Sequence, residues 1–391
     1  MEPLRISAYT LTSALGRGRA AHLEALRAER SGLSPQNVEG CTLETCVGAV
    51  PGLEAPLAGE HAHWDCRNNR LAQLALAQDE FRAAVERCRS RLGADRVGVF
   101  IGTSTSGVQQ TERAYRERDR AAERLPDFFL HRYTQNVFSA ADFVRVALGL
   151  AGPTLAISTA CSSSAKVFAS ARRAIAAGSC DAAVVGGVDS LCLTTLYGFN
   201  SLQLVSTEPC RPADRARNGI SIGEAAGFAL LEPGQGELMF LGYGESSDAH
   251  HMSAPDPQGR GASLAMRAAL RRAALEPGKV DYINLHGTAT PANDAAEDCA
   301  VREVFGSDVP QSSTKGWTGH TLGAAGGVEA AIALLCIESG LVPRSLNTRE
   351  KDPAILGNIV LENRSARVRR VLSNSFGFGG SNCSLILGGA A

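Results

Sequence analysis

Short apolar runs alternate with longer amphipathic segments along most of the chain. The runs at 97–102, 154–157 and 181–188 are typical of buried strands, whereas residues 67–93 and 162–178 space their apolar positions as helices do. The segment 67–93 is expected to be one continuous helix that ends at its final glycine. This alternation predicts a layered α/β fold.

From about Phe240 the alternation starts again. Further strand-like and helical segments occupy residues 239–246, 264–275, 280–291, 309–316, 320–340 and 366–389. Two pairs of segments look alike: FIGTSTSG resembles LHGTATPA, and STACSSSAKVF resembles TGHTLGAAGGVEA. We therefore expect a duplicated βαβ core with residues 1–235 and 236–391 as its halves, although chance similarity in an Ala-rich chain is the alternative. Helices built from Ala, Gly and Ser are expected to lie between two sheets.

Composition narrows the classes of function. The 391 residues carry a net charge of −1, so no global field attracts nucleic acid or an anionic membrane. No uncharged apolar run reaches the ~20 residues of a membrane span, and the first residues lack a signal-peptide pattern. Eleven scattered cysteines without a CxxC pair or zinc spacing predict free thiols and no metal site in a cytoplasmic protein.

The segment ISTACSSSAKVF places Cys161 between a short strand and a helix. We expect this thiol in the first turn of the helix, where unpaired N–H groups and the helix dipole favour a thiolate. A thiolate is the nucleophilic form of cysteine. The alternative is a buried structural cysteine, because free cysteine is among the most buried residue types.

Three other segments concentrate reactive residue types at strand ends. They are NLHGTATPANDAAEDCA with His286, STKGWTGHTLGAAGG with Lys315 and His320, and the Gly-rich turn SNSFGFGGSNCS. Strand carboxyl ends converge on one face of an α/β layer, so these residues are expected to meet Cys161. Each could instead be structural, and the pair His250 and His251 is interpreted as mostly structural or pocket-lining.

Together these segments resemble the β-ketoacyl-acyl carrier protein synthases of the type I/II kind. The matching text is STACSSSA, HGTATPANDAAE, STKGWTGHTLGAAGGVEA and NSFGFGGSN, with DAAVVGGVDSL and GISIGEAAGFALLEP in support. The resemblance implies a thiolase-like fold, in which duplicated βαβαβαββ halves form a five-layered αβαβα sandwich. It also implies decarboxylative Claisen condensation of malonyl-acyl carrier protein with an acyl chain.

The resemblance assigns the chemistry to three side chains. Cys161 would accept the acyl chain by transthioesterification. His286 and His320 would bind the malonyl thioester carbonyl and assist loss of its carboxylate. The backbone N–H groups of Cys161 and Phe378 would form the oxyanion hole, which requires the close backbone approach that the glycines allow.

Further roles follow from the same resemblance. Lys315 and Glu297 match a buried charged pair, and Lys315 is expected to orient His320. Other matches concern the substrate. Thr288 and Thr290 match threonines that bind phosphopantetheine, and Phe376 and Phe378 match the loop that gates access to the thiol. Phe199 matches an aromatic residue of the acyl pocket, and Val108 matches a position that limits chain length. No cofactor is implied beyond the phosphopantetheine of the acyl carrier protein.

The substrate and the second subunit stay open. Residues 109–135 and the segment GESSDAHHMSAPDPQG depart from the usual fatty-acid enzymes, and several segments look more like ketosynthases of aryl-polyene pigment clusters. The acyl chain could be fatty or polyenoyl. The dimer, expected through the sheet that contains DAAVVGG, could be a homodimer or a heterodimer with a chain-length-factor homologue.

Three other functions are weighed against this one. A thiolase would use a second cysteine, for which Cys383 is the candidate, but it follows the FGFGGSN turn. An initiating synthase would place an asparagine where His320 stands. A non-catalytic partner subunit would lack the nucleophile Cys161.

Overall fold

The core of the protein is one large mixed β-sheet, which consists mainly of two sets of five strands. In the computed structural model, which describes residues 1–389, the first set consists of β1 (Leu4–Ser13), β5 (Val97–Gly102), β6 (Thr154–Ile157), β7 (Ala182–Asp189) and β9 (Ala225–Pro233). The second set consists of β10 (Leu238–Ser247), β11 (Tyr282–Asn284), β12 (Gln311–Ser312), β15 (Arg370–Gly377) and β16 (Ser381–Gly389).

The strand order shows an internal repeat. It is β12-β11-β15-β16-β10-β1-β9-β7-β5-β6, so β10 and β1 meet in the middle, where only two residue pairs join them. In the first set β5 is parallel to β6 and β7, while β9 is antiparallel to β7 and β1. The second set has the same pattern, with β11, β12, β15, β16 and β10 in the corresponding places. The duplication expected from the sequence is confirmed.

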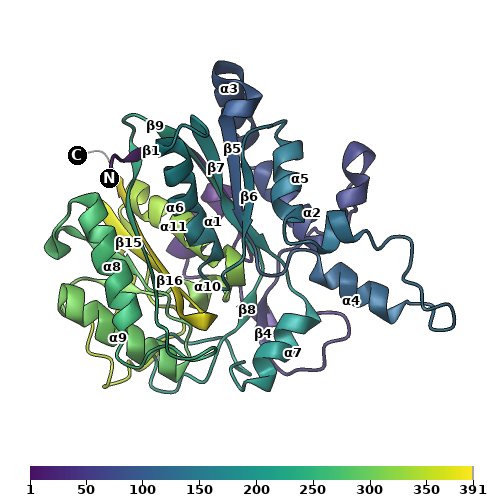
Figure 1. The fold of residues 1–391 in the computed structure, drawn as a ribbon. Coiled ribbons are helices and arrows are strands. Elements are labelled where there is room, and N and C mark those ends of the chain that lie inside the picture. Colours follow the sequence, from purple (N-terminus) through teal and green to yellow (C-terminus); the bar gives the residue numbers. More distant parts are fainter. Residues whose placement is uncertain (390–391) are drawn as a thin grey trace.

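Helices fill three layers around the two strand sets (Figure 1). The outer layer of the first half holds α2 (Arg67–Leu76), α3 (Phe81–Leu92) and α5 (Ser139–Ala147). The central layer holds α6 (Ser163–Ala176) and α11 (Ala325–Ser339). The outer layer of the second half holds α8 (Arg260–Ala273) and α9 (Pro291–Phe305). Three main apolar clusters coincide with the three helix layers, which confirms the five-layered αβαβα architecture.

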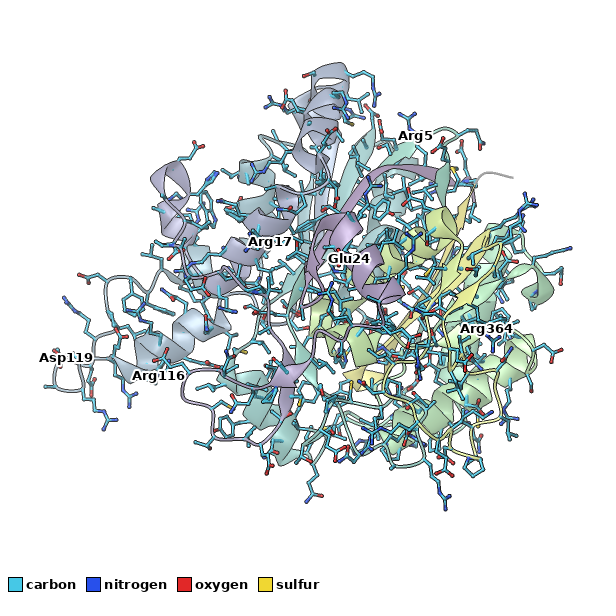
Figure 2. All side chains as sticks on the ribbon, turned by 180° about the vertical axis from the view of Figure 1, so that it is seen from behind. Arg5, Arg17, Glu24, Arg116, Asp119 and Arg364 are labelled. Carbon is cyan, nitrogen blue, oxygen red and sulfur yellow. The ribbon has the colours of Figure 1, made fainter. Side chains whose placement is uncertain are left out.

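Smaller elements complete the chain. The remaining helices are α1 (Gly18–Arg27), α4 (Val108–Arg116), α7 (Leu193–Ser201) and α10 (Lys315–Thr318), and the minor strands are β2 (Gly16–Arg17), β3 (Ser34–Pro35), β4 (Cys46–Gly48), β8 (Ile222–Gly223), β13 (Leu341–Val342) and β14 (Arg364–Ser365). α4 and the loop that follows it project from the body of the protein (Figure 1), and Figure 2 shows Arg116 and Asp119 on this projection.

Two local expectations were wrong. The segment 67–93 is not one helix, because Asp79 and Glu80 adopt left-handed backbone angles between α2 and α3. β6 is a strand, but it is not buried: it lies at the end of the sheet, and its Leu155 is 50% exposed.

Three further expectations concern the division into halves, the cysteines and the absence of a membrane span. The division at residues 235/236 stays a prediction, while β9 ends at Pro233 and β10 begins at Leu238. All eleven cysteines lie in the described part of the chain and are free. The stretch Leu322–Ser339 is apolar and long enough to cross a membrane, but 83% of it is buried inside the protein. Its composition is therefore that of a core helix in the central layer.

Candidate active site

Cys161 lies in a tight turn between β6 and α6. The helix begins at Ser163 with Ser162 as its N-cap, so Cys161 precedes the first helical turn rather than lying in it. Ala160 adopts a φ of 52°, a left-handed conformation that is uncommon for alanine. Its carbonyl accepts hydrogen bonds from the Oγ atoms of Ser104 (3.3 Å) and Ser163 (2.6 Å). These contacts hold the turn that presents the thiol.

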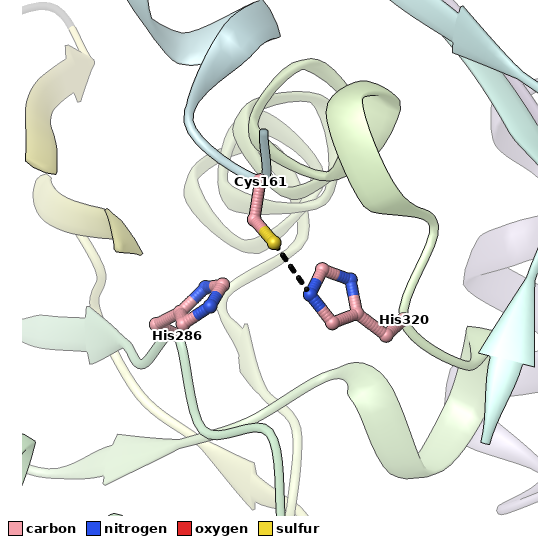
Figure 3. Close-up of side chains that lie close together, drawn as sticks. All are labelled: Cys161, His286 and His320. Atoms are coloured by element: carbon pink, nitrogen blue, oxygen red, sulfur yellow. Dashed lines mark hydrogen bonds between the residues drawn. The ribbon is translucent and has the colours of Figure 1, made fainter. Parts of the chain in front are cut away.

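Two histidines from the second half meet this thiol. His286 follows β11, and His320 follows α10. The Nε2 atom of His320 lies 3.1 Å from the Sγ atom of Cys161, and the two imidazole rings are 5.4 Å apart and nearly perpendicular (Figure 3). All three residues are buried, with exposed fractions of 5% for Cys161, 1% for His286 and 2% for His320. The structure thus brings together the three residues that the sequence singled out.

Hydrogen bonds define which ring nitrogen of each histidine carries the proton. The N–H of Leu322 donates to Nδ1 of His320 over 3.1 Å, so the neutral ring must carry its proton on Nε2, toward Cys161. Nδ1 of His286 lies 3.3 Å from Nζ of Lys315, and an ammonium group can only donate. His286 therefore also carries its proton on Nε2.

Both histidines are neutral at physiological pH. Burial and the positive charge of Lys315 lower the pKa of His320 well below its ordinary value. The same two causes, with the neighbouring His320 ring, lower the pKa of His286. The site therefore holds two neutral N–H donors, which suits a developing oxyanion.

Lys315 forms a buried ion pair, but not with the predicted partner. Its Nζ lies 2.6 Å from Oε1 of Glu329 in α11, and it contacts His286 instead of His320. The expected pairing with Glu297 was therefore wrong. Glu329 was missed by the sequence reasoning, although a single carboxylate in the apolar run GGVEAAIALLC is an available signal.

Glu297 has a different task. Its carboxylate accepts hydrogen bonds from the backbone N–H groups of His286 and Gly287, both over 2.8 Å, and from Nδ2 of Asn374 over 3.1 Å. Burial raises the pKa of Glu297 to about 7, against the effect of these hydrogen bonds. Glu297 thus holds the turn after β11, from which His286 extends.

Cys161 is a thiol at rest, contrary to the expectation that the helix start favours a thiolate. Burial raises the pKa of Cys161 to about 11, although the charge of Lys315 and the backbone N–H groups of Phe378 and Cys161 act in the opposite direction. Loss of solvation therefore outweighs the local dipoles. The same two N–H groups are those predicted to form the oxyanion hole, and both lower the pKa of the thiol.

A cavity of about 190 Å³ leads to the thiol. Phe199, Phe376 and Phe378 line it, as do Thr288 and Thr290. The rings of Phe199 and Phe378 are 5.5 Å apart, so the Gly-rich turn rests on α7 beside the thiol. These five residues lie where the predicted substrate roles require them, and the roles themselves stay predictions.

Val108 and Cys383 lie apart from this cavity. Val108 is the first residue of α4 and is not among the cavity-lining residues. Cys383 is a fully buried residue of β16 that does not line the cavity either, which gives the thiolase alternative no second cysteine beside Cys161.

The trio of Cys161, His286 and His320 has the composition of a metal site, with one ligand-type atom of each within 4.8 Å of the others. The hydrogen bonds to both Nδ1 atoms put protons on the Nε2 atoms, and a protonated nitrogen donates rather than ligates. The arrangement therefore favours binding of a negatively charged oxygen.

Covalent acyl transfer needs a nucleophile, donors for an oxyanion and a channel for the substrate, and this cavity supplies all three. The fold and the cavity define a cysteine-dependent acyl-transferring enzyme on a duplicated five-layer core.

Comparisons with known proteins give the family. The family model for the N-terminal domain of β-ketoacyl synthases matches residues 71–236, and the model for their C-terminal domain matches residues 239–349. The chain belongs to the β-ketoacyl synthase family, and it is an acyltransferase of the 3-oxoacyl-[acyl-carrier-protein] synthase class.

Relatives with curated functions cover most of the chain. The mitochondrial 3-oxoacyl-[acyl-carrier-protein] synthase of Arabidopsis thaliana is 38% identical over 338 residues, which is 81% of this chain and 72% of that protein. The 3-oxoacyl-[acyl-carrier-protein] synthase 2 of Staphylococcus aureus (strain COL) is 35% identical over 381 residues, which is 90% of this chain and 91% of that protein.

Solved structures agree with this assignment. A ketosynthase from Xenorhabdus doucetiae, determined in complex with its chain length factor, is 37% identical and superposes with a TM-score of 0.91 over 100% of this chain and 98% of that chain. The ishigamide ketosynthase/chain length factor is 26% identical, with a TM-score of 0.89 and full coverage of both chains.

Proposed function

We propose that this β-ketoacyl synthase elongates an acyl chain carried on Cys161, using malonyl-acyl carrier protein as the extender. The observation that carries this proposal is the 3.1 Å contact between Sγ of Cys161 and Nε2 of His320 at the base of one cavity, with His286 beside it. The reaction proceeds in two half-reactions that use the same cavity.

The first half-reaction loads the chain. The sulfur of Cys161 attacks the carbonyl carbon of an acyl thioester on acyl carrier protein, and the N–H groups of Cys161 and Phe378 hold the oxyanion. Collapse of this intermediate breaks the bond to the carrier sulfur. The thiol proton of Cys161 passes to that leaving sulfur, so acyl-Cys161 and free carrier thiol are formed.

The second half-reaction extends the chain. The malonyl carboxylate leaves as carbon dioxide, and its bonding electrons form an enolate whose oxygen accepts the Nε2 protons of His286 and His320 in hydrogen bonds. The enolate carbon then attacks the acyl carbonyl on Cys161. Expulsion of the cysteine sulfur, which takes up one proton, leaves a 3-oxoacyl chain two carbons longer on the carrier.

The carrier supplies the only prosthetic group in this scheme. Both substrates would arrive as thioesters on the phosphopantetheine of acyl carrier protein. Thr288 and Thr290 line the cavity and share a hydrogen bond of 2.9 Å between their hydroxyl groups. Because these hydroxyl groups also accept the N–H groups of Thr290 and Asn293, one donor and one acceptor position are left for the amides of such an arm.

We also propose a second subunit of the same fold at the β6 end of the sheet. Among the described strands β6 pairs with β5 alone, and its apolar Leu155 is 50% exposed. The X. doucetiae ketosynthase and the ishigamide ketosynthase are each described with a chain length factor. This likeness favours a heterodimer, and a homodimer is the alternative.

The acyl substrate follows from the same likeness. Similarity to a ketosynthase of the chain-length-factor type favours a conjugated, aryl-capped polyenoyl chain, whereas the fatty-acid relatives favour a saturated chain. In either case the enzyme elongates the acyl chain. The free cysteines agree with a cytoplasmic location.

The test of the proposed chemistry separates its two halves. Intact-mass spectrometry after incubation with an acyl-carrier thioester should show one acyl adduct on Cys161, and none in Cys161→Ala. His286→Ala and His320→Ala should still acquire this adduct but lose release of carbon dioxide from malonyl-carrier protein. An adduct on another residue, or unchanged release, would refute the assignment.

A survey of carrier thioesters decides the substrate. Chain length and unsaturation should be varied with and without a candidate chain-length-factor homologue. Condensation of polyenoyl thioesters only in the presence of the partner supports the heterodimer. Efficient condensation of saturated chains by this chain alone supports the homodimer.

A further inference from the structure

We propose that Asp189 is a positioning residue that holds the Cys161 turn and the His320 loop in register. It is the last residue of β7, and no part of it is exposed. Among the residues that the structure describes, no lysine, arginine or histidine forms an ion pair with it, so neutral donors alone satisfy its carboxylate. This inference rests on the catalytic roles proposed for Cys161 and His320.

The carboxylate gathers donors from both halves of the protein. Its Oδ1 atom accepts hydrogen bonds from the turn after β5: the Oγ1 of Thr103 (2.6 Å), the N–H of Ser104 (2.8 Å), and both the N–H and the Oγ1 of Thr105 (2.8 Å each). Its Oδ2 atom accepts the N–H of Gly323 over 2.6 Å. Gly323 belongs to the second half of the duplicated fold.

Each side of this junction leads directly to a reacting side chain. On the first side, Oγ of Ser104 donates to the carbonyl of Ala160, the residue before Cys161. On the other side, Gly323 follows Leu322, whose N–H defines the proton position of His320. Two hydrogen-bond steps thus connect Asp189 with the nucleophile and with its donor.

Gly323 shows how close this approach is. A Cβ atom on Gly323 would lie 2.7 Å from the backbone N of Ser104 and 2.7 Å from Oδ2 of Asp189, which are distances that real Cβ atoms essentially never show. The loop that carries His320 therefore reaches the β5 turn only because this position has no side chain. The contact is direct, without room for adjustment.

The duplicated fold offers an internal comparison. In the second half Glu297 holds the equivalent turn after β11 by accepting two backbone N–H groups. Glu297 and its described partners all belong to that half, whereas Asp189 binds donors from both halves. The Cys161–His320 pair also crosses between the halves, so Asp189 is placed to set the distance between its members.

The test uses Asp189→Asn, which keeps the size of the side chain but replaces an acceptor oxygen with an NH₂ donor that faces other donors. Asp281→Asn is the matched control, because Asp281 also accepts two backbone N–H groups, from Arg369 and Arg370, away from the cavity. Condensation by Asp189→Asn should fall by about tenfold or more, and Asp281→Asn should stay near the wild type.

A second readout separates positioning from general stability. In Asp189→Asn the pH profile of Cys161 alkylation by iodoacetamide should move upward by about half a pH unit, because the His320 donor no longer stabilises the thiolate. In a His320→Ala background Asp189→Asn should cause no further shift. A shift of equal size in both backgrounds would overturn the proposal, as would a folded Asp189→Asn that condenses at the wild-type rate.

Ser104→Ala covers the case in which Asp189→Asn fails to fold. It removes only the contact with the Ala160 carbonyl, and acyl loading of Cys161 should slow severalfold while the melting temperature is kept. An unchanged loading rate in Ser104→Ala would overturn the proposal. Alkylation does not depend on the natural substrate, so failure of the proposed condensation would be seen separately, as a wild-type enzyme that forms no acyl adduct.

Discussion

At the scale of single residues, burial decides the protonation state of the site. Burial raises the pKa of Cys161 and lowers the pKa of both histidines, so all three groups are neutral near pH 7. The charge of Lys315 acts on all three in the same electrostatic sense, since it favours the thiolate and disfavours an imidazolium. For the two histidines Lys315 therefore adds to the effect of burial, and for Cys161 it partly opposes that effect.

Lys315→Met should slow alkylation of Cys161. Loss of the positive charge raises the pKa of the thiol further above about 11, so less thiolate exists at any pH below that value. We expect a rate about tenfold lower at pH 8, which corresponds to about one pKa unit, measured with iodoacetamide under pseudo-first-order conditions. In both proteins the rate should rise with pH through pH 9 without a plateau.

The control for this experiment is Lys279→Met on the surface. Because Lys315→Met leaves the buried carboxylate of Glu329 without its partner, the double variant with Glu329→Gln should restore stability. It should restore the alkylation rate only in part, because the charge of Glu329 raises the pKa of Cys161 less than the charge of Lys315 lowers it. A wild-type rate in the single variant Lys315→Met would show that the charge does not reach the thiol.

The residues of the site were more predictable than their partners. Cys161, His286 and His320 stand in short motifs at strand ends, and strand ends converge in any α/β layer. The partner of Lys315 depends on which helix passes over it, and motif spacing carries no such information. For the same reason the sequence could not show that loss of solvation outweighs the helix start at Cys161.

At the scale of elements, the close packing of the two central helices requires residues with a very small side chain or none. α6 and α11 cross between the strand sets, and a Cβ atom on Gly326 of α11 would lie 2.6 Å from the backbone N of Ala165 in α6. The helix backbones therefore touch. The same contact places the start of α6, and with it the Cys161 turn, against the His320 loop.

Gly326→Ala should destabilise the protein by about 1–3 kcal/mol, because the added methyl group overpacks this crossing. Gly198→Ala is the matched control: Gly198 lies in α7, and nothing lies within 4 Å of its added Cβ. In the control, helix propensity should make the change neutral or stabilising by up to about 1 kcal/mol. Urea unfolding followed by circular dichroism measures both, and equal effects would contradict the close crossing.

Composition and periodicity predicted this layer well, and predicted other elements less well. A helix that is rich in Ala and Gly can pack closely against a sheet on both sides, so such a run indicates a helix between two sheets. The break between α2 and α3 gave no such signal, because Asp79 and Glu80 take their left-handed angles without glycine or proline. The central strands β1 and β9 pair with each other although they lie far apart in the sequence. A local sequence pattern carries no information about such a pairing.

At the scale of the whole molecule, the large sheet has an open edge strand at its β6 end. The β12 end carries an isolated bridge to Ile359, whereas β6 pairs with no strand other than β5 in the described part of the chain. An open strand edge with exposed apolar side chains invites another chain. The projection formed by α4 and its following loop extends from the same half of the molecule (Figures 1 and 2), which suits contact with a second body.

Leu155→Lys should therefore prevent subunit assembly. Lysine on an open edge resists strand pairing, and a charge buried in an interface without a partner is unfavourable. Light scattering after size exclusion should show a monomer for the chain purified alone, and co-purification with a chain-length-factor homologue should be lost. Leu264→Lys is the control, because Leu264 is 57% exposed but belongs to α8 in the opposite outer layer. If Leu155→Lys assembles as the wild type does, the subunit contact lies elsewhere; if Leu264→Lys also becomes a monomer, the effect is one of added charge rather than of the β6 edge.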